Sequence, residues 1–184
     1  MQALPRPAVE RLHRRTGCFA GAFDKGRRSG YNARRNGYEI SGYGRDEMNV
    51  VIIDGQGGGV GKALVAAVRQ AVPEAAVIAV GTNSAATAGM RKAGAQRAAT
   101  GENAVVVCCR KADVILGPIG IVIADSLLGE ITPAMALAVG QSSAKRILIP
   151  VNHCDNIVAG VSDLAMGALV DSAVRELARI HAAY

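Results

Sequence analysis

The sequence predicts an α/β protein: a Rossmann-like, doubly wound parallel sheet of about five strands in the order 3-2-1-4-5, preceded by a disordered N-terminal segment. Three observations support this class. Short runs rich in Val, Ile and Ala alternate with segments long enough for helices, a glycine-rich stretch follows the first run, and capping residues stand at the boundaries. Strands that alternate with helices need crossover connections, which give a parallel sheet covered on both faces.

The expected strands are the apolar runs between turn signals: NVVIID (49–54), AAVIAVG (75–81), a weaker AQRAA (95–99), DVILG (113–117) and RILIPV (146–151). Strands buried on both faces of a parallel sheet are nearly continuous in apolar residues, as most of these runs are. The expected helices lie between and after the strands, at 59–72, 84–93, 102–111, 120–129 with 133–142, and 163–182.

Residues that begin or end helices agree with these segments. Pro73 ends the first helix, and Gly94 follows the second as a C′ glycine. Thr132 is an N-cap followed by Pro133 at the first helical position. Asp125 ends the run GIVIAD, which is similar to an apolar strand with a metal-binding Asp, but its surroundings favour a helix.

Residues 1–47 differ from residues 48–184 in charge and composition. The net charge of the chain is +6, of which +5 lies in residues 1–47, and both phenylalanines and three of the four tyrosines lie there too. No sustained apolar period could bury a face of this segment, so we expect it to be largely disordered. Residues 48–184 then form the Rossmann-like nucleotide-binding domain.

Three interpretations of residues 1–47 stay open. A basic segment with interleaved tyrosines can bind nucleic-acid phosphates and stack on bases, but such tails are more often solvated, so nucleic acid is not an expected partner. We favour a third interpretation, in which the segment is translated from a start codon assigned too early and the natural chain begins at Met48. The first strand begins directly after Met48, and the composition changes there.

The stretch from Gly55 to Gly61 is the strongest functional signal, because five of its seven residues lack a side chain. G-x-G-x-x-G counted from Gly55 fails at Val60, and the P-loop pattern fails at Ala63, where a hydroxyl is needed. The pattern G-x-x-x-G-x-G fits, with Gly59 in its middle. Here the sequence resembles the nucleotide loop of short-chain dehydrogenases.

That resemblance ends with the loop. Short-chain dehydrogenases have a catalytic Tyr-x-x-x-Lys pair, whereas residues 48–184 contain no tyrosine except Tyr184. Their chemistry is therefore excluded. We assign no catalytic residue, and whether the protein is an enzyme stays undecided.

Ligands of doubly wound sheets bind outside the carboxyl ends of the strands, where the strand order reverses. In this chain that edge brings together the residues after the first, second, fourth and fifth strands. Glycine amides there would contact a phosphate, Lys62 would be its charge partner and Asn83 would bind the ribose. The expected cofactor-binding residues are Asp54, Gly55, Gln56, Gly57, Gly58, Gly59, Val60, Gly61, Lys62, Thr82, Asn83, Gly117 and Pro118.

Asp54 keeps alternatives open. Its carboxylate would repel a pyrophosphate unless a cation lies between them or loop N–H groups occupy it. A Mg²⁺-dependent nucleoside phosphate enzyme that uses Asp54 and Lys62 is therefore an alternative to NAD(P) binding. A structural glycine turn with no ligand is another. After the second strand, dinucleotide binders usually have an acidic residue for the ribose, whereas Thr82 and Asn83 are neutral.

Other residues predict no chemistry. Cys18, Cys108, Cys109 and Cys154 form no C-x-x-C pair and no zinc spacing, so we expect reduced thiols in a cytoplasmic protein and no metal site. His153 lies next to Cys154, so their side chains should diverge and not form a nucleophilic pair. No apolar run is long enough for a membrane span. A chain with few aromatics and no visible substrate domain is also expected to form a homo-oligomer that completes the open side of the cleft.

Several motifs together resemble one family. They are VVIIDGQGGGVGKA, AVGTN, ATGENAVVV, ADVILGPIGIVIADSLLGEITPAMA and KRILIPVN, which span nearly all of residues 48–184. They are similar to a small bacterial family catalogued as a domain of unknown function, DUF3842. The resemblance implies a start at Met48 and supplies no activity, and Asp125 stands where relatives have Asn. A third functional hypothesis is therefore a non-enzymatic regulatory or partner-binding domain.

Overall fold

The computed structural model describes residues 47–151, 158–161 and 164–184. The expectations for the N-terminal segment up to residue 46, and for the residues after the fifth strand such as His153 and Cys154, concern residues outside these ranges. The boundary expected after residue 47 stays a prediction.

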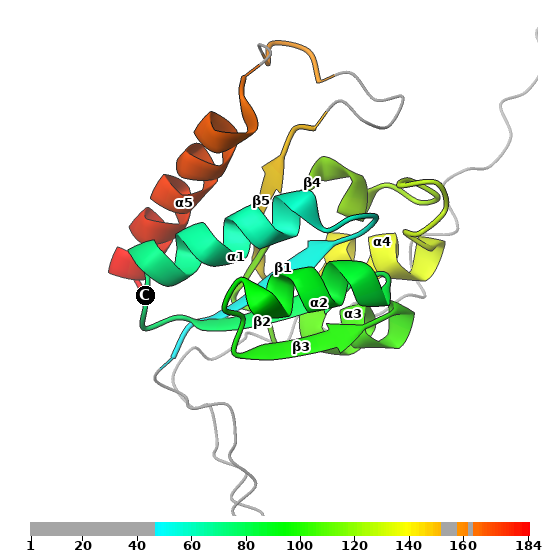
Figure 1. The fold of residues 1–184 in the computed structure, drawn as a ribbon, viewed down its shortest axis with the longest axis horizontal. Coiled ribbons are helices and arrows are strands. Elements are labelled where there is room, and N and C mark those ends of the chain that lie inside the picture. The colour runs from blue at the N-terminus through cyan, green and yellow to red at the C-terminus, as the bar shows by residue number, and fades with distance from the viewer. Residues whose placement is uncertain (1–46, 152–157, 162–163) are drawn as a thin grey trace, which may run out of the picture. The chain divides into compact units, whose positions relative to one another are not determined.

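The described residues form a five-stranded, all-parallel sheet in the order β3-β2-β1-β4-β5, as the sequence predicts (Figure 1). The strands are β1 (Asn49–Asp54), β2 (Ala76–Gly81), β3 (Arg97–Thr100), β4 (Val114–Pro118) and β5 (Lys145–Ile149). The predicted strand boundaries differ from these by at most two residues. Asp54 pairs in register with Gly81, so the loops after β1 and β2 leave the sheet side by side.

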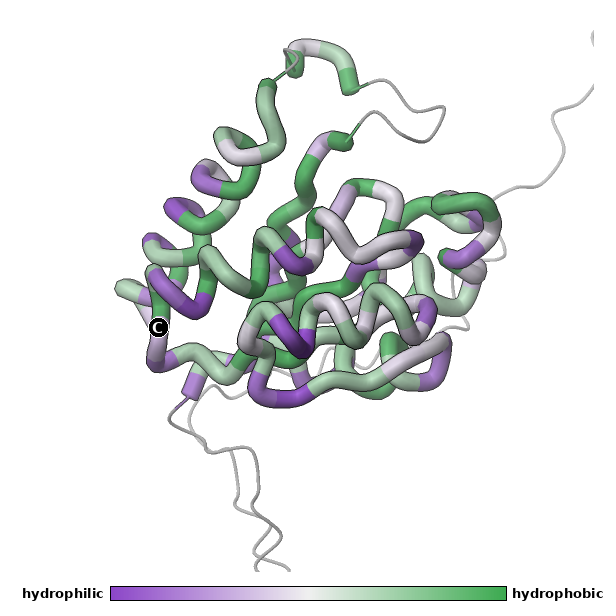
Figure 2. The backbone as a smooth tube through the Cα atoms, in the orientation of Figure 1, coloured by the Kyte–Doolittle hydropathy of each residue, from purple (hydrophilic) through white to green (hydrophobic). Residues whose placement is uncertain are grey.

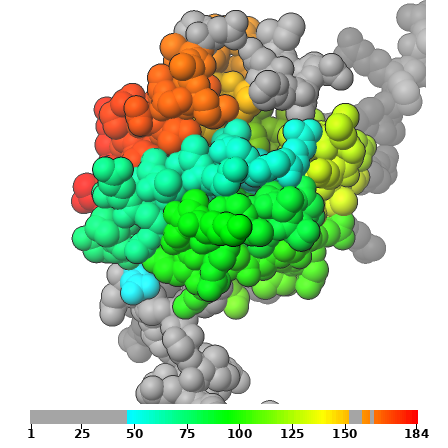
Figure 3. All heavy atoms as spheres, in the orientation of Figure 1, coloured from blue at the N-terminus to red at the C-terminus, as the bar shows by residue number. Residues whose placement is uncertain are grey.

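Helices cover both faces of the sheet. On one face lie α1 (Gly59–Ala71), α2 (Ser84–Lys92) and α5 (Met166–Ala182), and on the other lie α3 (Glu102–Cys109) and α4 (Pro133–Gln141) (Figure 1). The three helices of the first face form the surface turned toward the viewer in Figure 3. Hydrophilic and hydrophobic stretches alternate along α5 in Figure 2, as expected of a helix packed on one side.

The core has two halves because side chains of a strand alternate between the faces of the sheet. Val50 and Ile52 of β1 pack toward α1, α2 and α5, whereas Val51 and Ile53 pack toward α3 and α4. All four side chains are fully buried. By the same alternation Asp54 follows Ile52 on the α1 side, which places its carboxylate under the start of that helix.

Capping residues act as their types predict. Gly94 has a φ of 112° after α2, and the amides of Gly94 and Ala95 bond to the carbonyls of Arg91 and Met90, which is a Schellman motif. The Thr132 hydroxyl accepts the Met135 amide at 3.2 Å at the start of α4. The predicted Pro73, Gly94 and Thr132 signals are therefore confirmed.

The helix expected at 120–129 is wrong. A short 3-10 helix, η1 (Ile119–Val122), is followed by a compact loop in which Asp125, Leu127 and Leu128 have φ values of 62°, 55° and 58°. Such left-handed backbone is incompatible with a right-handed helix. The Ser126 hydroxyl donates to the carbonyl of Gly120 at 2.6 Å, which is the local competition with helix bonding that serine favours.

Candidate functional site

A cavity of about 400 Å³ lies at the carboxyl edge of the sheet, beside the start of α1. Its walls come from the loop after β1 with the start of α1, the end of β4 with η1 and the loop that follows, the residues after β5, and the first residue of α5. The lining residues are Asp54, Gly55, Gln56, Gly57, Gly58, Gly59, Val60, Pro118, Gly120, Leu127, Val151 and Met166. The glycine loop and Pro118 therefore meet at one cavity, as the fold class predicts.

Asp54 caps the start of α1 from the end of β1. Its carboxylate accepts the Gly55 amide at 2.8 Å and the Gly61 amide at 2.6 Å, and the residue is only 4% exposed. Burial raises the pKa of Asp54 above its ordinary value, and nearby Glu130 adds to this, although the two amides oppose the shift. Of the two conditions that the sequence allows for Asp54 beside an anion, loop N–H groups occupying the carboxylate is the one observed.

Glu130 is a second carboxylate at the loop, and sequence reasoning missed it. It accepts the Gln56 amide at 2.8 Å, the Asn83 side-chain amide at 3.0 Å and the Thr82 hydroxyl, all on Oε2. Partial burial opposes ionisation, but the donors from Thr82, Gln56 and Asn83 outweigh it and lower the pKa of Glu130. Glu130 thus joins the tip of β2 to the glycine loop.

Asn83 holds the same loop from the other side. Its Oδ1 accepts the Ala86 amide at 2.9 Å as the N-cap of α2, and its Nδ2 donates to the Gln56 carbonyl at 3.0 Å as well as to Glu130. Both amide hydrogens and the oxygen of Asn83 are therefore already engaged within the protein. Its expected contact with a ribose stays a prediction that needs these bonds to rearrange.

Three of the loop glycines are required by close packing. A Cβ on Gly55 would lie 2.7 Å from Glu130 Oε2, and one on Gly61 would lie 2.7 Å from the Cβ of Asp54. Gly58 is the N-cap of α1 in the left-handed conformation, and a Cβ there would lie 2.8 Å from the Cα of Ala86. Packing within the protein therefore accounts for glycine at these three positions without a ligand.

Gly57 and Gly59 differ from the other three. A Cβ on either would meet no atom of the described residues within 4 Å, and neither has a left-handed backbone. Within the described residues, the amides of Gly57, Gly59 and Val60 have no protein acceptor, whereas those of the other loop residues do. Unpaired amides thus meet open space at the start of α1.

The remaining predicted residues lie near the cavity in different ways. Thr82 faces Glu130, and Pro118 lines the cavity. Gly117 lets β4 approach the backbone of β1 closely, because its Cβ would overlap the Ile53 carbonyl. The aliphatic stem of Lys62 packs over Gly89 of α2, and Lys62 is not among the residues that line the cavity.

The two described cysteines lie on α3, outside the lining of this cavity. Burial raises the pKa of both Cys108 and Cys109, that of Cys109 to about 11, so both thiols stay protonated at neutral pH. In the part of the chain that the structure describes, no three His, Cys, Asp or Glu residues are grouped as metal ligands, and no helix is long and apolar enough to cross a bilayer.

Comparisons with known proteins give one match. Residues 49–182 match the model of a family described as Domain of unknown function (DUF3842). No curated protein and no solved structure matches the chain.

Proposed function

The chain therefore belongs to the DUF3842 family, and we propose that it binds a dinucleotide of the NAD(P) type, with a phosphate at the loop from Gly57 to Gly61. The observation that supports this most is the contrast within the loop. Packing accounts for Gly55, Gly58 and Gly61, but no contact within the described residues needs a glycine at Gly57 or Gly59. A ligand that approaches the backbone closely would need both.

The amides are suited to an anion. Gly59 and Val60 are the first two residues of α1, so their N–H groups point out of the helix N-terminus, where the helix dipole favours negative charge. The Gly57 amide lies just before them and also has no acceptor among the described residues. Together they offer hydrogen bonds to phosphate oxygens without any side chain.

The charges around the cavity favour a dinucleotide over a nucleoside triphosphate. Among the described residues that line the cavity there is no Lys, Arg or His, and the carboxylates of Asp54 and Glu130 lie close by. Each phosphate in the pyrophosphate of a dinucleotide has one negative charge, whereas a terminal phosphate has about −1.5 to −2. A site built from amides alone tolerates the smaller charge better.

The Mg²⁺-dependent alternative has less support. Both oxygens of Asp54 accept amide hydrogens, and Lys62 lies outside the cavity lining. Within the described part of the chain, Asp54 is also the one titratable residue that lines the cavity. The proposal is therefore for binding in the cytoplasm without an assigned reaction, which includes a regulatory role.

The apolar part of the lining fits the rest of a nucleotide. Leu127, Val151 and Met166 give the cavity an apolar side. Pockets for cofactors are mostly apolar with a few placed polar groups, which here are the amides. A ring system on that side would be separated from water while the phosphate contacts the start of α1.

The test is calorimetry of the purified protein with NADH, NADPH and ATP, each with and without Mg²⁺. We expect binding of a dinucleotide that is independent of Mg²⁺ and is abolished by Gly59→Val. Gly140→Val is the matched control, because Gly140 also has open space around it but lies on α4, away from the cavity. Equal affinity of wild type and Gly59→Val would overturn the proposal, and so would binding of ATP only with Mg²⁺.

A further inference from the structure

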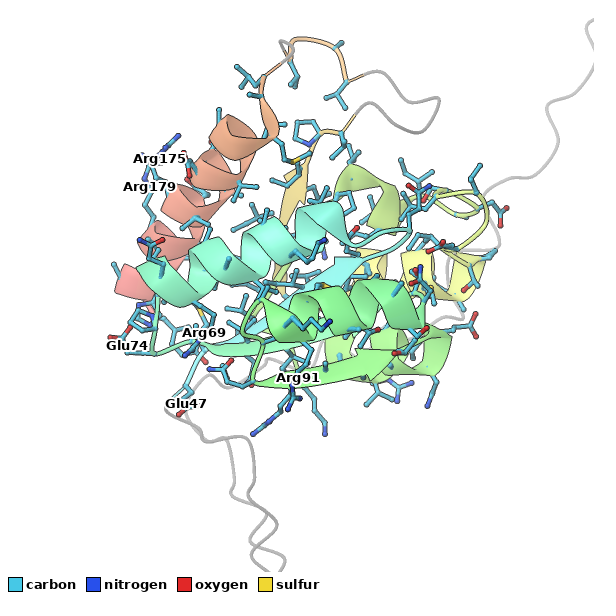
Figure 4. The ribbon with its side chains drawn as sticks, in the orientation of Figure 1. Glu47, Arg69, Glu74, Arg91, Arg175 and Arg179 are labelled. Carbon is cyan, nitrogen blue, oxygen red and sulfur yellow. The ribbon has the colours of Figure 1, made fainter. Side chains whose placement is uncertain are left out.

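The helices α3 and α4 present an apolar outer face. A helix that packs on one side normally has charged residues on the other, as α1, α2 and α5 do. Figure 4 shows Arg175 and Arg179 on the outer side of α5. On the opposite face of the sheet, α4 contains no charged residue, and its Leu137 is 57% exposed. Val107 of α3 is 37% exposed.

A groove of about 550 Å³ lies on this face. It is lined by Val106, Cys109, Arg110, Ala134, Leu137, Ala138, Gln141, Ser142 and Ser143, which come from α3, α4 and the residues after each. The small side chains of Ala134 and Ala138 leave room for another side chain, and Leu137 stands beside that room. The same face therefore has both a projecting leucine and a hollow.

The two charges at the ends of α3 have opposite sign. Glu102 is the first residue of α3, where it accepts the Thr132 hydroxyl at 2.5 Å, and Arg110 is the C-cap. Among the described residues Arg110 makes no ion pair. If two α3 helices lie antiparallel, Glu102 of each is beside the partner's Arg110. The charge pattern is therefore complementary to itself under a two-fold axis.

We propose that a second copy of this chain docks on the face formed by α3 and α4, with the two copies related by a two-fold axis and their α3 helices antiparallel. Each Leu137 then enters the groove of the other copy. A two-fold dimer needs one surface patch that is complementary to itself. This face has a projecting Leu137 beside a groove, and a negative Glu102 and a positive Arg110 at opposite ends of α3. A face of one sign, or a groove without a projection, would favour a different partner.

This inference goes beyond the proposed function and does not depend on it. The groove and the cavity at the glycine loop share no lining residue. The proposed dimer also differs from the oligomer expected from the sequence, which would complete the open side of the cleft. Loss of dimerisation and loss of nucleotide binding are thus separate outcomes.

The first test is sedimentation of the full chain from about 1 to 100 μM, a range chosen because two short helices give a small interface. Leu137→Glu should raise the dimer dissociation constant at least about a hundredfold, since each dimer loses two buried leucines. Leu164→Glu is the matched control, because Leu164 is 51% exposed and lies outside the groove. A monomeric wild type, or a dimer that Leu137→Glu leaves intact, overturns the proposal.

The second test uses charge and does not alter the apolar face. Glu102→Arg and Arg110→Glu should each weaken the dimer about fivefold to tenfold, because like charges then face each other twice. An equimolar mixture of the two variants should form a heterodimer as tight as the wild type, since both contacts are again of opposite sign. Circular dichroism verifies that each variant is folded. A mixture no tighter than the separate variants overturns the antiparallel arrangement.

Discussion

The loop from Gly55 to Gly61 has two sets of glycines that look alike in the sequence and differ in their surroundings. At Gly55, Gly58 and Gly61 a side chain would collide with groups of β1, α2 or Glu130, or would force a left-handed residue. At Gly57 and Gly59 a side chain would meet open space. The first set is needed for packing and backbone conformation, so only the second set, Gly57 and Gly59, is informative about a ligand.

The two carboxylates near the loop explain how the first set is held. The carboxylate of Asp54 accepts the amides of Gly55 and Gly61, and the carboxylate of Glu130 accepts the amide of Gln56. Their pKa values shift in opposite directions, because burial dominates at Asp54 and hydrogen-bond donors dominate at Glu130. Acidic residues beside a proposed anion site are thus paired with the protein's own amides.

The largest effect on stability is expected from Gly61→Ala. The new Cβ would lie 2.5 Å from Sδ of Met90 and 2.7 Å from the Cβ of Asp54, and the latter cannot move without β1. Such overpacking should lower the free energy of unfolding by about 2 kcal/mol, even though alanine favours a helix more than glycine does. Urea denaturation followed by circular dichroism measures this.

Gly59→Ala is the control for this variant, since Gly59 lies in the same first turn of α1 with open space around it. It should be as stable as the wild type. If Gly61→Ala also kept wild-type stability, the distinction between packed and open glycines would be wrong.

An intermediate effect is expected from Glu130→Gln. A glutamine keeps an oxygen acceptor but loses the charge that strengthens three hydrogen bonds, so stability at neutral pH should fall by about 1 kcal/mol. Because folding lowers the pKa of Glu130, its stabilisation is present above the ordinary glutamate pKa and is lost as pH falls through the folded value. Urea titrations at several pH values measure the difference between the two proteins.

That difference should shrink on acidification. The contribution of Asp54 to stability depends on pH in the opposite direction: because folding raises its pKa, this contribution is present at low pH and is lost as pH rises. Both proteins keep Asp54, so it does not affect the difference between them. A gap between wild type and Glu130→Gln that stayed constant from neutral to acidic pH would contradict the assigned role of Glu130.

The sequence predicts the fold well because the signals for it are local. Buried parallel strands appear as apolar runs, and Gly94 and Thr132 have their usual capping roles. The failure at 120–129 is instructive, because its apolar spacing suits a helix while Ser126 and the left-handed residues that follow form a compact loop. Whether such a run forms a helix depends on its packing against β4 and α4, which no local pattern records.

The site was predicted only in outline, for the same reason. The glycine loop is visible in the sequence, but which glycines are packed depends on Ala86, Met90 and Glu130, which lie far along the chain. Glu130 has no local signal that separates it from a surface glutamate. The contacts of Asn83 with Ala86 and Gln56 also have no local signal beyond its N-cap position, and its contact with a ribose stays a prediction.

Gly57→Ala is expected to have the smallest effect on stability and is the sharpest test of the comparison between the packed and the open glycines. A methyl group there meets no atom of the described residues and needs no unusual backbone, so the free energy of unfolding should stay within about 0.5 kcal/mol of the wild type. The same methyl would stand in the space in front of unpaired amides, so dinucleotide affinity should fall at least about tenfold, or 1.4 kcal/mol. Calorimetry measures this against Gly140→Ala. Lost affinity with unchanged stability separates a ligand contact from a packing contact, whereas unchanged affinity would mean that the open glycines do not touch the nucleotide.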